Sequence, residues 1–371
     1  MGHSKDLNYK YERLYRILFN EEMYYVAYQR IYAKQGNMTA GSDGETIDGM
    51  SLVRIEKLIA SLKDETYQPN PSRRTYIPKK NGKMRPLGIP AINDKLLQEV
   101  VRMILEAIYE GQFENCSHGF RPKRSCHTAI KQIGVTFCGV KWYVEGDIKG
   151  FFDNINHDVM ISILRERIID DRFIRLIRKF LNAGYIEDWV FNRTYSGTPQ
   201  GGLISPILAN IYLDRLDKYM VEYAVKFEKG LRKKKRTEYR HYQRKKGRAT
   251  KELKSVKTQT EREAIIERVK KYNKLILQIE PNDEMDSEYR RLRYVRYADD
   301  FLCGIIGSKE DAQVIKEDIK KFLSEKLKLE LSDEKTLITH SEAPANFLGF
   351  HIRNRKSDHT KRDSLGRLKR C

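Results

Sequence analysis

Apolar residues recur at helical spacing in several stretches of the chain, and this periodicity predicts its main helices. One clear case is residues 92–109, which form a long amphipathic pattern. Ser51 and Ser205 stand where an N-cap is expected, and Pro206 follows in the first helical position. We expect helices over residues 7–34, 51–63, 92–109 and 125–137, from about residues 158, 171 and 205, and over residues 309–328.

Shorter apolar runs between turn residues predict strands. Asn81-Gly82 separates two such runs in "RRTYIPKKNGKMRPLGIP" and is a strong hairpin signal. Further strands are expected at residues 142–148, as a pair within 189–197, as a hairpin over 292–306, and at 335–340 and 346–352. Strands and helices alternate without a regular parallel repeat, so the predicted fold class is α+β.

Two adjacent aspartates, Asp299 and Asp300, interrupt the hairpin in "YVRYADDFLCG". Asp147 lies near the end of the strand at 142–148, and pairing would bring all three carboxylates to one end of a sheet. A single buried aspartate is usually a cap or an ion-pair partner, and Asp-Asp alone indicates an ordinary turn. Three carboxylates together repel one another unless a cation joins them, and hard oxygen ligands favour Mg²⁺ or Mn²⁺. Two such ions are the usual arrangement for in-line phosphoryl transfer.

Two other segments are suited to a nucleoside triphosphate. "RRTYIPKKNGKMR" contains six Lys or Arg residues and no acidic residue within thirteen positions. "GTPQGG" exposes a glycine-rich backbone that can approach a ligand closely. The sequence has no GxxxxGK[ST] motif, which excludes a P-loop enzyme.

The net charge of +20 is concentrated in two stretches. Residues 226–274 hold 20 Lys and Arg against 6 Asp and Glu, residues 351–371 hold 8 against 2, and the rest of the chain balances. Concentrated basic charge is typical of contact with a phosphate backbone. For 226–274 we favour nucleic acid over a solvated helix, because Tyr239, Tyr242 and Tyr272 lie among the charges and can stack on bases. For 351–371 nucleic-acid binding and a solvated tail are equally compatible.

No apolar run is long enough to span a membrane, and the N-terminus has no apolar signal core, so no membrane partner is predicted. The five cysteines are not spaced as zinc ligands or as a redox pair. This usage indicates a reducing cytoplasm and no structural metal.

The chain resembles group II intron-encoded reverse transcriptases, also called maturases, in a series of motifs. "YADD" at 297–300 is similar to their Tyr-X-Asp-Asp motif. In chain order the series is "GSDG", "IPKKNGKMRPLGIP", "SHGFRPKRSCHTAI", "GDIKGFFDNINHD", "GTPQGGLISPILANIYLDRLD", "VRYADDFLCG", "LSDEKT" and "FLGF". Eight motifs in order, over about residues 36–350, make the resemblance specific.

The resemblance implies an RNA-directed DNA polymerase with two Mg²⁺ ions, or Mn²⁺, at three catalytic aspartates. Asp147 and Asp299 would be the main metal ligands, with Asp300 in support. Phe152 would be the aromatic residue that excludes a ribose 2′-hydroxyl, with Phe151 as the alternative. The other implied dNTP contacts are Lys79, Lys83, Arg85, Gln200 and Lys335, and the implied primer grip is Phe347, Leu348, Gly349 and Phe350.

The resemblance also implies that the basic insertion binds intron RNA, as in the subgroup related to mitochondrial introns. The residues expected to do so are Arg232, Lys233, Lys234, Lys235, Arg236, Arg240, Arg244, Lys245, Lys246 and Arg248. The implied partners are intron RNA, an RNA template with a DNA primer, and dNTPs, in a bacterial cytoplasm. The tyrosines of "RILFNEEMYYVAYQRIY" are compatible with a homodimer.

The implied architecture is the fingers and palm of a right-hand polymerase, with an antiparallel palm sheet. The segments are 1–65, a helical extension with a template-covering loop; 66–140, fingers; 141–225, palm and inner fingers; 226–290, basic helical insertion; 291–355, palm with catalytic hairpin and primer grip; and 356–371, basic tail. The family continues into a thumb, whereas this sequence ends about twenty residues after "FLGF", so we expect the thumb to be absent.

Two other functions fit parts of this pattern. One is an RNA-binding splicing cofactor with little polymerase activity. The other is a viral RNA-dependent RNA polymerase, although those enzymes usually carry Gly-Asp-Asp where this chain has "ADD". A comparison of rNTP with dNTP incorporation separates the latter from a reverse transcriptase.

Overall fold

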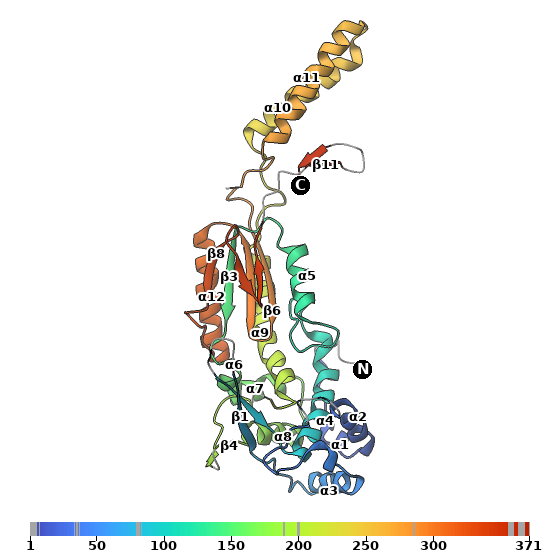
Figure 1. The fold of residues 1–371 in the computed structure, drawn as a ribbon, viewed down its shortest axis with the longest axis vertical. Coiled ribbons are helices and arrows are strands. Elements are labelled where there is room, and N and C mark those ends of the chain that lie inside the picture. The colour runs from blue at the N-terminus through green and yellow to red at the C-terminus, as the bar shows by residue number, and fades with distance from the viewer. Residues whose placement is uncertain are drawn as a thin grey trace.

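The structure is a computed structural model of the whole chain. It describes residues 6, 8–32, 34, 36, 38–78, 82, 84–187, 190–198, 201–284 and 286–354, and the backbone alone of Thr360–Arg362 and Leu368–Arg370. The molecule is elongated, with a helical region and a small sheet at one end, a larger sheet in the middle, and a pair of helices projecting at the other end (Figure 1). The predicted α+β class is confirmed, with antiparallel pairing throughout the larger sheet.

The N-terminal region is helical but does not form the single helix expected over residues 7–34. It contains α1 (Leu14–Ile17) and α2 (Glu21–Ile31), separated at Asn20. The Asn20 side chain accepts a hydrogen bond from the backbone N–H of Glu22 at 3.0 Å and so starts a new helix. After the loop with the short 3₁₀ turn Ile47–Gly49, Ser51 caps α3 (Leu52–Lys63), as predicted.

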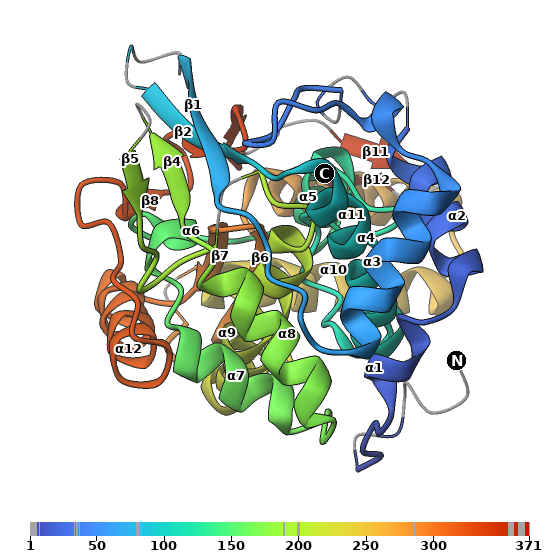
Figure 2. The same cartoon turned by 90° about the horizontal axis from the view of Figure 1, so that it is seen from below.

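The small sheet has the strand order β2-β1-β4-β5. β1 (Ser72–Pro78) and β2 (Met84–Ile89) form the predicted hairpin, and α4 (Ile92–Tyr109) follows with the predicted bounds. β4 (Tyr185–Glu187) joins β1 in parallel and pairs with β5 (Val190–Asn192). The strand pair expected within 189–197 therefore begins earlier, at Tyr185. This sheet and the helices α1–α3 lie at the same end of the molecule (Figure 1). Viewed down the long axis, they are on opposite sides of it (Figure 2).

The larger sheet has the strand order β6-β7-β3-β8, and every neighbouring pair is antiparallel. Its strands are β3 (Trp142–Asp147), β6 (Arg291–Tyr297), β7 (Asp300–Ile306) and β8 (Leu337–His340). Its helices are α5 (Cys126–Thr136), α9 (Ser205–Phe227) and α12 (Lys309–Leu327). Ile204 stands at the N-cap of α9 and Ser205 is its first residue, so the predicted cap was one residue off.

The two faces of this sheet bury different residues, because successive side chains of a strand point to opposite sides. Val144, Tyr294 and Cys303 belong to the main core, which includes α9 and α12. Tyr143 and Val295 belong to a second, smaller cluster with α5. The sheet is covered on both faces, which explains why its central strand β7 has no polar side chain after Asp300.

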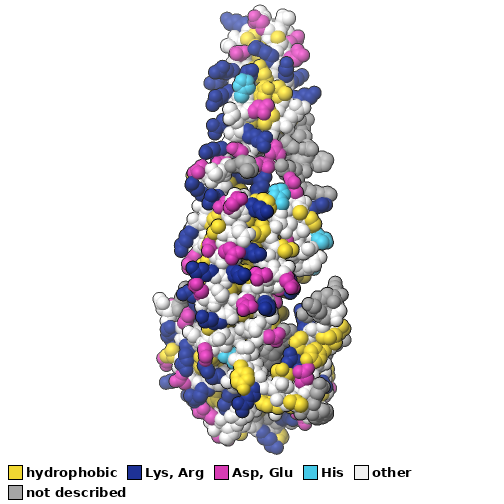
Figure 3. Space-filling view, turned by 90° about the vertical axis from the view of Figure 1, so that its left-hand side faces the viewer, with side chains coloured by type: hydrophobic (Ala, Val, Ile, Leu, Met, Phe, Trp, Pro, Cys, Tyr) yellow, Lys and Arg dark blue, Asp and Glu magenta, His cyan; other side chains and the backbone are white. Residues whose placement is uncertain are grey.

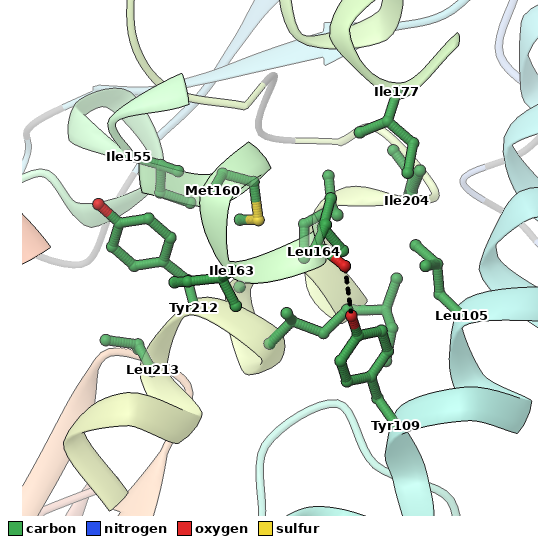
Figure 4. Packing of buried hydrophobic residues seen from close by; sticks show 14 of the residues in the cluster. Leu105, Tyr109, Ile155, Met160, Ile163, Leu164, Ile177, Ile204, Tyr212 and Leu213 are labelled. Atoms are coloured by element: carbon green, nitrogen blue, oxygen red, sulfur yellow. Dashed lines mark hydrogen bonds between the residues drawn. The ribbon is translucent and has the colours of Figure 1, made fainter. Parts of the chain in front are cut away.

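The main core continues from the sheet into the helical end. Tyr212 on α9 and the residues around it pack against α7 (His157–Arg165) and α4 (Figure 4). Tyr109 and Tyr212 direct their hydroxyls to backbone carbonyls, at Leu164 and Leu327 respectively. The remaining elements are α6 (Phe151–Asn154), α8 (Asp171–Leu181), the 3₁₀ turn Glu110–Gln112, β9 (Ala345–Phe347), β10 (Phe350–Ile352), β11 (Thr360–Arg362) and β12 (Leu368–Arg370).

The basic segment forms two long helices, α10 (Thr237–Ser255) and α11 (Gln259–Gln278), which project from the molecule at the end opposite the small sheet (Figure 1). We call this pair the stalk. Ala249 and Ile265 are its buried residues, and most of its other described side chains are exposed or half-buried. Among the described residues, no helix combines the length and the apolar character needed to cross a membrane. The segment boundaries given above stay predictions.

Candidate active site

The three aspartates lie at one end of the larger sheet. Asp147, the last residue of β3, stands directly opposite Asp300, the first residue of β7. Asp300 in turn pairs with Tyr297, which closes the β6–β7 hairpin around Ala298 and Asp299. Carboxylates far apart in the sequence thus meet across one ladder, as expected from pairing of the strand at 142–148 with the hairpin.

The electrostatics of this sheet end show an excess of negative charge. Burial raises the pKa of Asp299, and Asp147 raises it further. Burial, then Asp299 and Asp147, raise the pKa of Asp300 to about 7. Lys335 places its ammonium 2.8 Å from Asp147 Oδ2, and this hydrogen bond raises the pKa of Lys335. The carboxylates are therefore held close enough to suppress one another's ionisation, which a bound cation would relieve.

The donor set fits a hard divalent cation. Its ligands are carboxylate oxygens, which Mg²⁺ and Mn²⁺ prefer. Within the described residues, no group of three His, Cys, Asp or Glu side chains is already gathered tightly enough to hold an ion. Lys335 bonds to one oxygen of Asp147, so this ammonium already balances part of the negative charge that a metal would neutralise.

The basic hairpin of the small sheet faces these carboxylates. Arg85 lies on β2 opposite Ile77, and its charge partly offsets the rise in the pKa of Asp299 that burial causes. A cation from the small sheet therefore stands within electrostatic reach of the catalytic candidates, as a triphosphate-binding residue should. Lys79, Lys83 and Gln200 lie outside the described residues.

The two neighbouring phenylalanines have different surroundings. Phe151 is 1% exposed and packs toward Tyr212 in the core, with ring centroids 6.4 Å apart. Phe152 is half-buried and lies against Phe120 at 6.3 Å, and Phe120 in turn reaches Tyr297 at 6.5 Å. Phe152 is thus the residue that faces the carboxylate end of the sheet. Sequence reasoning missed Phe120, whose only signal is an aromatic residue beside glycine in "SHGFRP".

Phe152 also lines a cavity of about 370 Å³ between the small sheet and the glycine-rich loop. Gly197 and Gly201 of that loop have positive φ angles, and a Cβ on either would lie 2.5 Å from a backbone oxygen, of Phe152 or Gly88. Only glycine fits such approaches, so the loop backbone lies directly on its neighbours. The cavity also includes Arg74 and Tyr185, which sequence reasoning did not single out; their cation–π contact is 4.1 Å.

The predicted primer-grip residues form a tight hairpin beside the larger sheet. β9 and β10 are joined at Leu348 and Gly349, both with positive φ. Glu145 on β3 accepts a hydrogen bond from the backbone N–H of Asn346 at 2.7 Å, which fixes this hairpin to the strand that carries Asp147. Phe347 is buried, whereas Phe350 is partly exposed, with its ring near that of His127.

The predicted RNA-binding residues lie on the stalk and at its base, where Lys and Arg side chains are numerous (Figure 3). Several of these residues contact other residues of the stalk or of its base. Lys246 donates to Asn273 at 2.7 Å, and Lys233 lies over the ring of Tyr289. Lys234 and Arg236 form ion pairs with acidic residues, and Lys235 lies over Tyr239. The exposed members are Arg232, Lys234, Lys235, Arg236, Arg240, Arg244, Lys245 and Arg248.

Comparison with known proteins agrees with this geometry. The family model "Reverse transcriptase (RNA-dependent DNA polymerase)" matches residues 77–243 and 264–352. The Group II intron-encoded protein LtrA of Lactococcus lactis subsp. cremoris is 50% identical over 362 residues, covering 97% of this chain and 59% of LtrA. An uncharacterized 91 kDa protein in the cob intron of Schizosaccharomyces pombe is 42% identical, covering 92% of this chain and 41% of its own length.

Protein YkfC of Escherichia coli is 35% identical and covers 95% of this chain and 86% of its own length. This chain therefore spans little more than half of LtrA but most of YkfC. The family match covers more than half of the chain and includes both strands of the aspartate hairpin. The chain belongs to the reverse transcriptase family, and its relatives include a group II intron-encoded protein.

Proposed function

We propose that this chain is the nucleotidyl-transfer core of an RNA-directed DNA polymerase that also binds intron RNA. The observation that carries the proposal is the meeting of Asp147, Asp299 and Asp300 at one sheet end, opposite Arg85. In the reaction a primer 3′-hydroxyl attacks the α-phosphate of a dNTP, and pyrophosphate leaves. Two Mg²⁺ ions, or Mn²⁺, at Asp147 and Asp299, with Asp300 in support, would supply electrostatic stabilisation of the phosphoryl oxygens.

The chain's own residues bind and orient the reactants. Arg85, with Lys79 and Lys83 of the same hairpin, would hold the triphosphate, and Gln200 would contact the incoming nucleotide. Lys335 would exchange Asp147 for the triphosphate when the site loads, because its ammonium already lies at the carboxylate end. Phe152 would exclude a 2′-hydroxyl, and the β9–β10 hairpin would hold the primer.

Primer extension tests this proposal. The protein, an RNA template with a DNA primer, and dNTPs should give extension with Mg²⁺ or Mn²⁺ and none with a chelator. Preference for rNTPs would overturn the assignment as a reverse transcriptase. Extension by an Asp299→Ala variant at the wild-type rate would overturn the assignment of the site.

A second candidate function, as an RNA-binding splicing cofactor with little polymerase activity, is favoured by the stalk. Its exposed basic face projects away from the sheet and needs no catalytic site to hold RNA. If the chain binds a group II intron RNA but extends no primer, RNA binding alone would be its function.

A homodimer stays a prediction, supported by the exposed apolar or aromatic side chains of Tyr25, Val26 and Tyr32 in and after α2. Sedimentation would test it.

A further inference from the structure

The catalytic hairpin turns through a residue that does not favour its conformation. Ala298, between Tyr297 and Asp299, has a φ of 55°. This left-handed region is unfavourable for a residue with a Cβ, and glycine or asparagine is the usual choice there. Something in the surrounding structure must therefore hold this turn in place.

Arg296 provides that support from the buried side of β6. Its Nη1 donates to the carbonyl oxygen of Ala298 at 2.8 Å. Its Nε and Nη2 form a two-pronged pair with the Asp217 carboxylate at 2.7 and 2.6 Å, and Nη2 also donates to Ser117 Oγ at 2.7 Å. Arg296 and Asp217 are both completely buried. A planar guanidinium with this many partners has one orientation, so it fixes the carbonyl that it holds.

A loop that pairs with β6 at Arg296, together with Asn210 of α9, completes the support. Asn210 on α9 donates to the carbonyl oxygen of Gly119 at 2.8 Å and accepts from Arg296 Nη1 at 3.3 Å. Gly119 lies directly against the turn, because a Cβ there would be 2.3 Å from the backbone nitrogen of Ala298. The turn is thus enclosed between a buried guanidinium and a glycine backbone. We call Ser117, Asn210, Asp217 and Arg296 the Arg296 network.

We propose that the Arg296 network is a set of positioning residues that fixes Asp299 for nucleotidyl transfer. The proposal rests on the proposed function. Asp217 and Asn210 belong to α9, the helix that directly follows the glycine-rich loop. One rigid helix therefore sets the position of both the nucleotide loop and the catalytic turn. A displacement of about 1 Å in a reacting group can reduce a rate by about 100-fold, so a fixed turn has a direct catalytic consequence.

The informative variant replaces both charges of the buried pair. Removing Arg296 alone would leave Asp217 buried without its partner, which destabilises a fold strongly. The double variant Arg296→Met with Asp217→Asn leaves no buried charge but removes the donor to Ala298. Arg293→Met is the matched control, because Arg293 lies on the same strand and pairs with Glu228 at the surface.

We expect the double variant to lose about 100-fold in kcat for primer extension, with the KM for dNTP within about two-fold of wild type. Its melting temperature should stay close to that of the control. Hydrogen exchange at the amides of residues 297–300 should be faster than in the control. Asn210→Ala is a milder change and should lower kcat and speed exchange at residues 297–300 to a smaller extent. It replaces the double variant as the test if the double variant does not fold.

A folded variant with wild-type kcat, or with unchanged exchange at residues 297–300, would overturn the proposal. A parallel loss of kcat and melting temperature in every variant, with no separate change in exchange at the turn, would assign the network to stability alone. If the wild-type protein extends no primer, the proposed function fails. The exchange measurement still tests in that case whether Arg296 holds the turn.

Discussion

Arginine side chains lie in opposite environments in two regions of the molecule. At the end of the larger sheet, Arg296 is fully buried and bonds to Asp217, Ser117 and the backbone of Ala298. On the stalk, Arg244 and Arg248 are exposed on a helix with a single buried residue. A buried guanidinium fixes geometry, whereas an exposed one supplies charge that moves with its ligand. This difference supports the proposal that the carboxylate end of the sheet carries the reaction and the stalk attracts phosphate, and substitutions should separate the two.

The largest expected effect is on the reaction alone. Asp299→Asn should reduce primer extension by at least about 1,000-fold, because it removes a carboxylate where charge develops in the transition state. Affinity for intron RNA should stay the same, since the stalk keeps its charges. Single-turnover extension and filter binding measure the two quantities. Asp158→Asn, an exposed aspartate paired with Arg178, is the matched control and should change neither.

The next effect concerns which nucleotide the sheet end accepts. Phe152→Val should raise rNTP use relative to dNTP by about 10- to 100-fold, because the half-buried ring lines the cavity beside the glycine-rich loop. Phe151→Val should leave the ratio unchanged and reduce the free energy of unfolding by about 1–3 kcal/mol, because that ring is in the core. Competition between labelled rNTP and dNTP, with thermal melting, tests both. The opposite result would make Phe151 the discriminating residue.

Substitutions in the stalk should instead change the affinity for intron RNA and the dependence of that affinity on salt concentration. Arg244→Ala with Arg248→Ala should weaken intron RNA binding about ten-fold and lower the slope of log K against log salt by about two. Lys321→Ala with Lys326→Ala removes two exposed charges from α12 and is the control. Equal slopes in both variants would mean that the stalk holds RNA no better than any other basic surface. Primer extension on a short template should be unaffected in either.

The sequence predicts the sheet end well because its signals are local or long and periodic. Asp299 and Asp300 stand out in an apolar hairpin, and α4 was found with its observed bounds. The supporting contacts are not predictable in this way. Arg296 and Asp217 lie 79 positions apart, and β6 carries three arginines of which only Arg296 is buried, so the residue type alone does not single it out. Likewise, one polar residue, Asn20, divided the helix expected over 7–34, because capping competes with continuation of the apolar pattern.

The smallest expected effect is a pH dependence confined to the sheet end. His118, in the loop that holds the catalytic turn, bonds through its ring to Thr128 and Gln132. Burial lowers the pKa of His118. The hydrogen bond with Gln132 raises this pKa, and the charges of Arg124, Arg121 and Arg296 lower it further. The stability from the neutral ring is therefore fully present above the ordinary pKa of 6.5 and is lost as pH falls through the lower folded value.

The melting temperature, measured between about pH 5 and pH 8, should thus fall more steeply with decreasing pH for wild type than for His118→Gln. Hydrogen exchange should locate the difference in the loop around His118 and in the β6–β7 hairpin, because the backbone N–H of His118 bonds to the carbonyl of Arg296 at 2.9 Å. The stalk has no such contact in its described residues, and its exchange should follow only the chemical pH dependence. Acid-induced opening that began in the stalk would contradict the contrast between a fixed sheet end and an exposed basic helix pair.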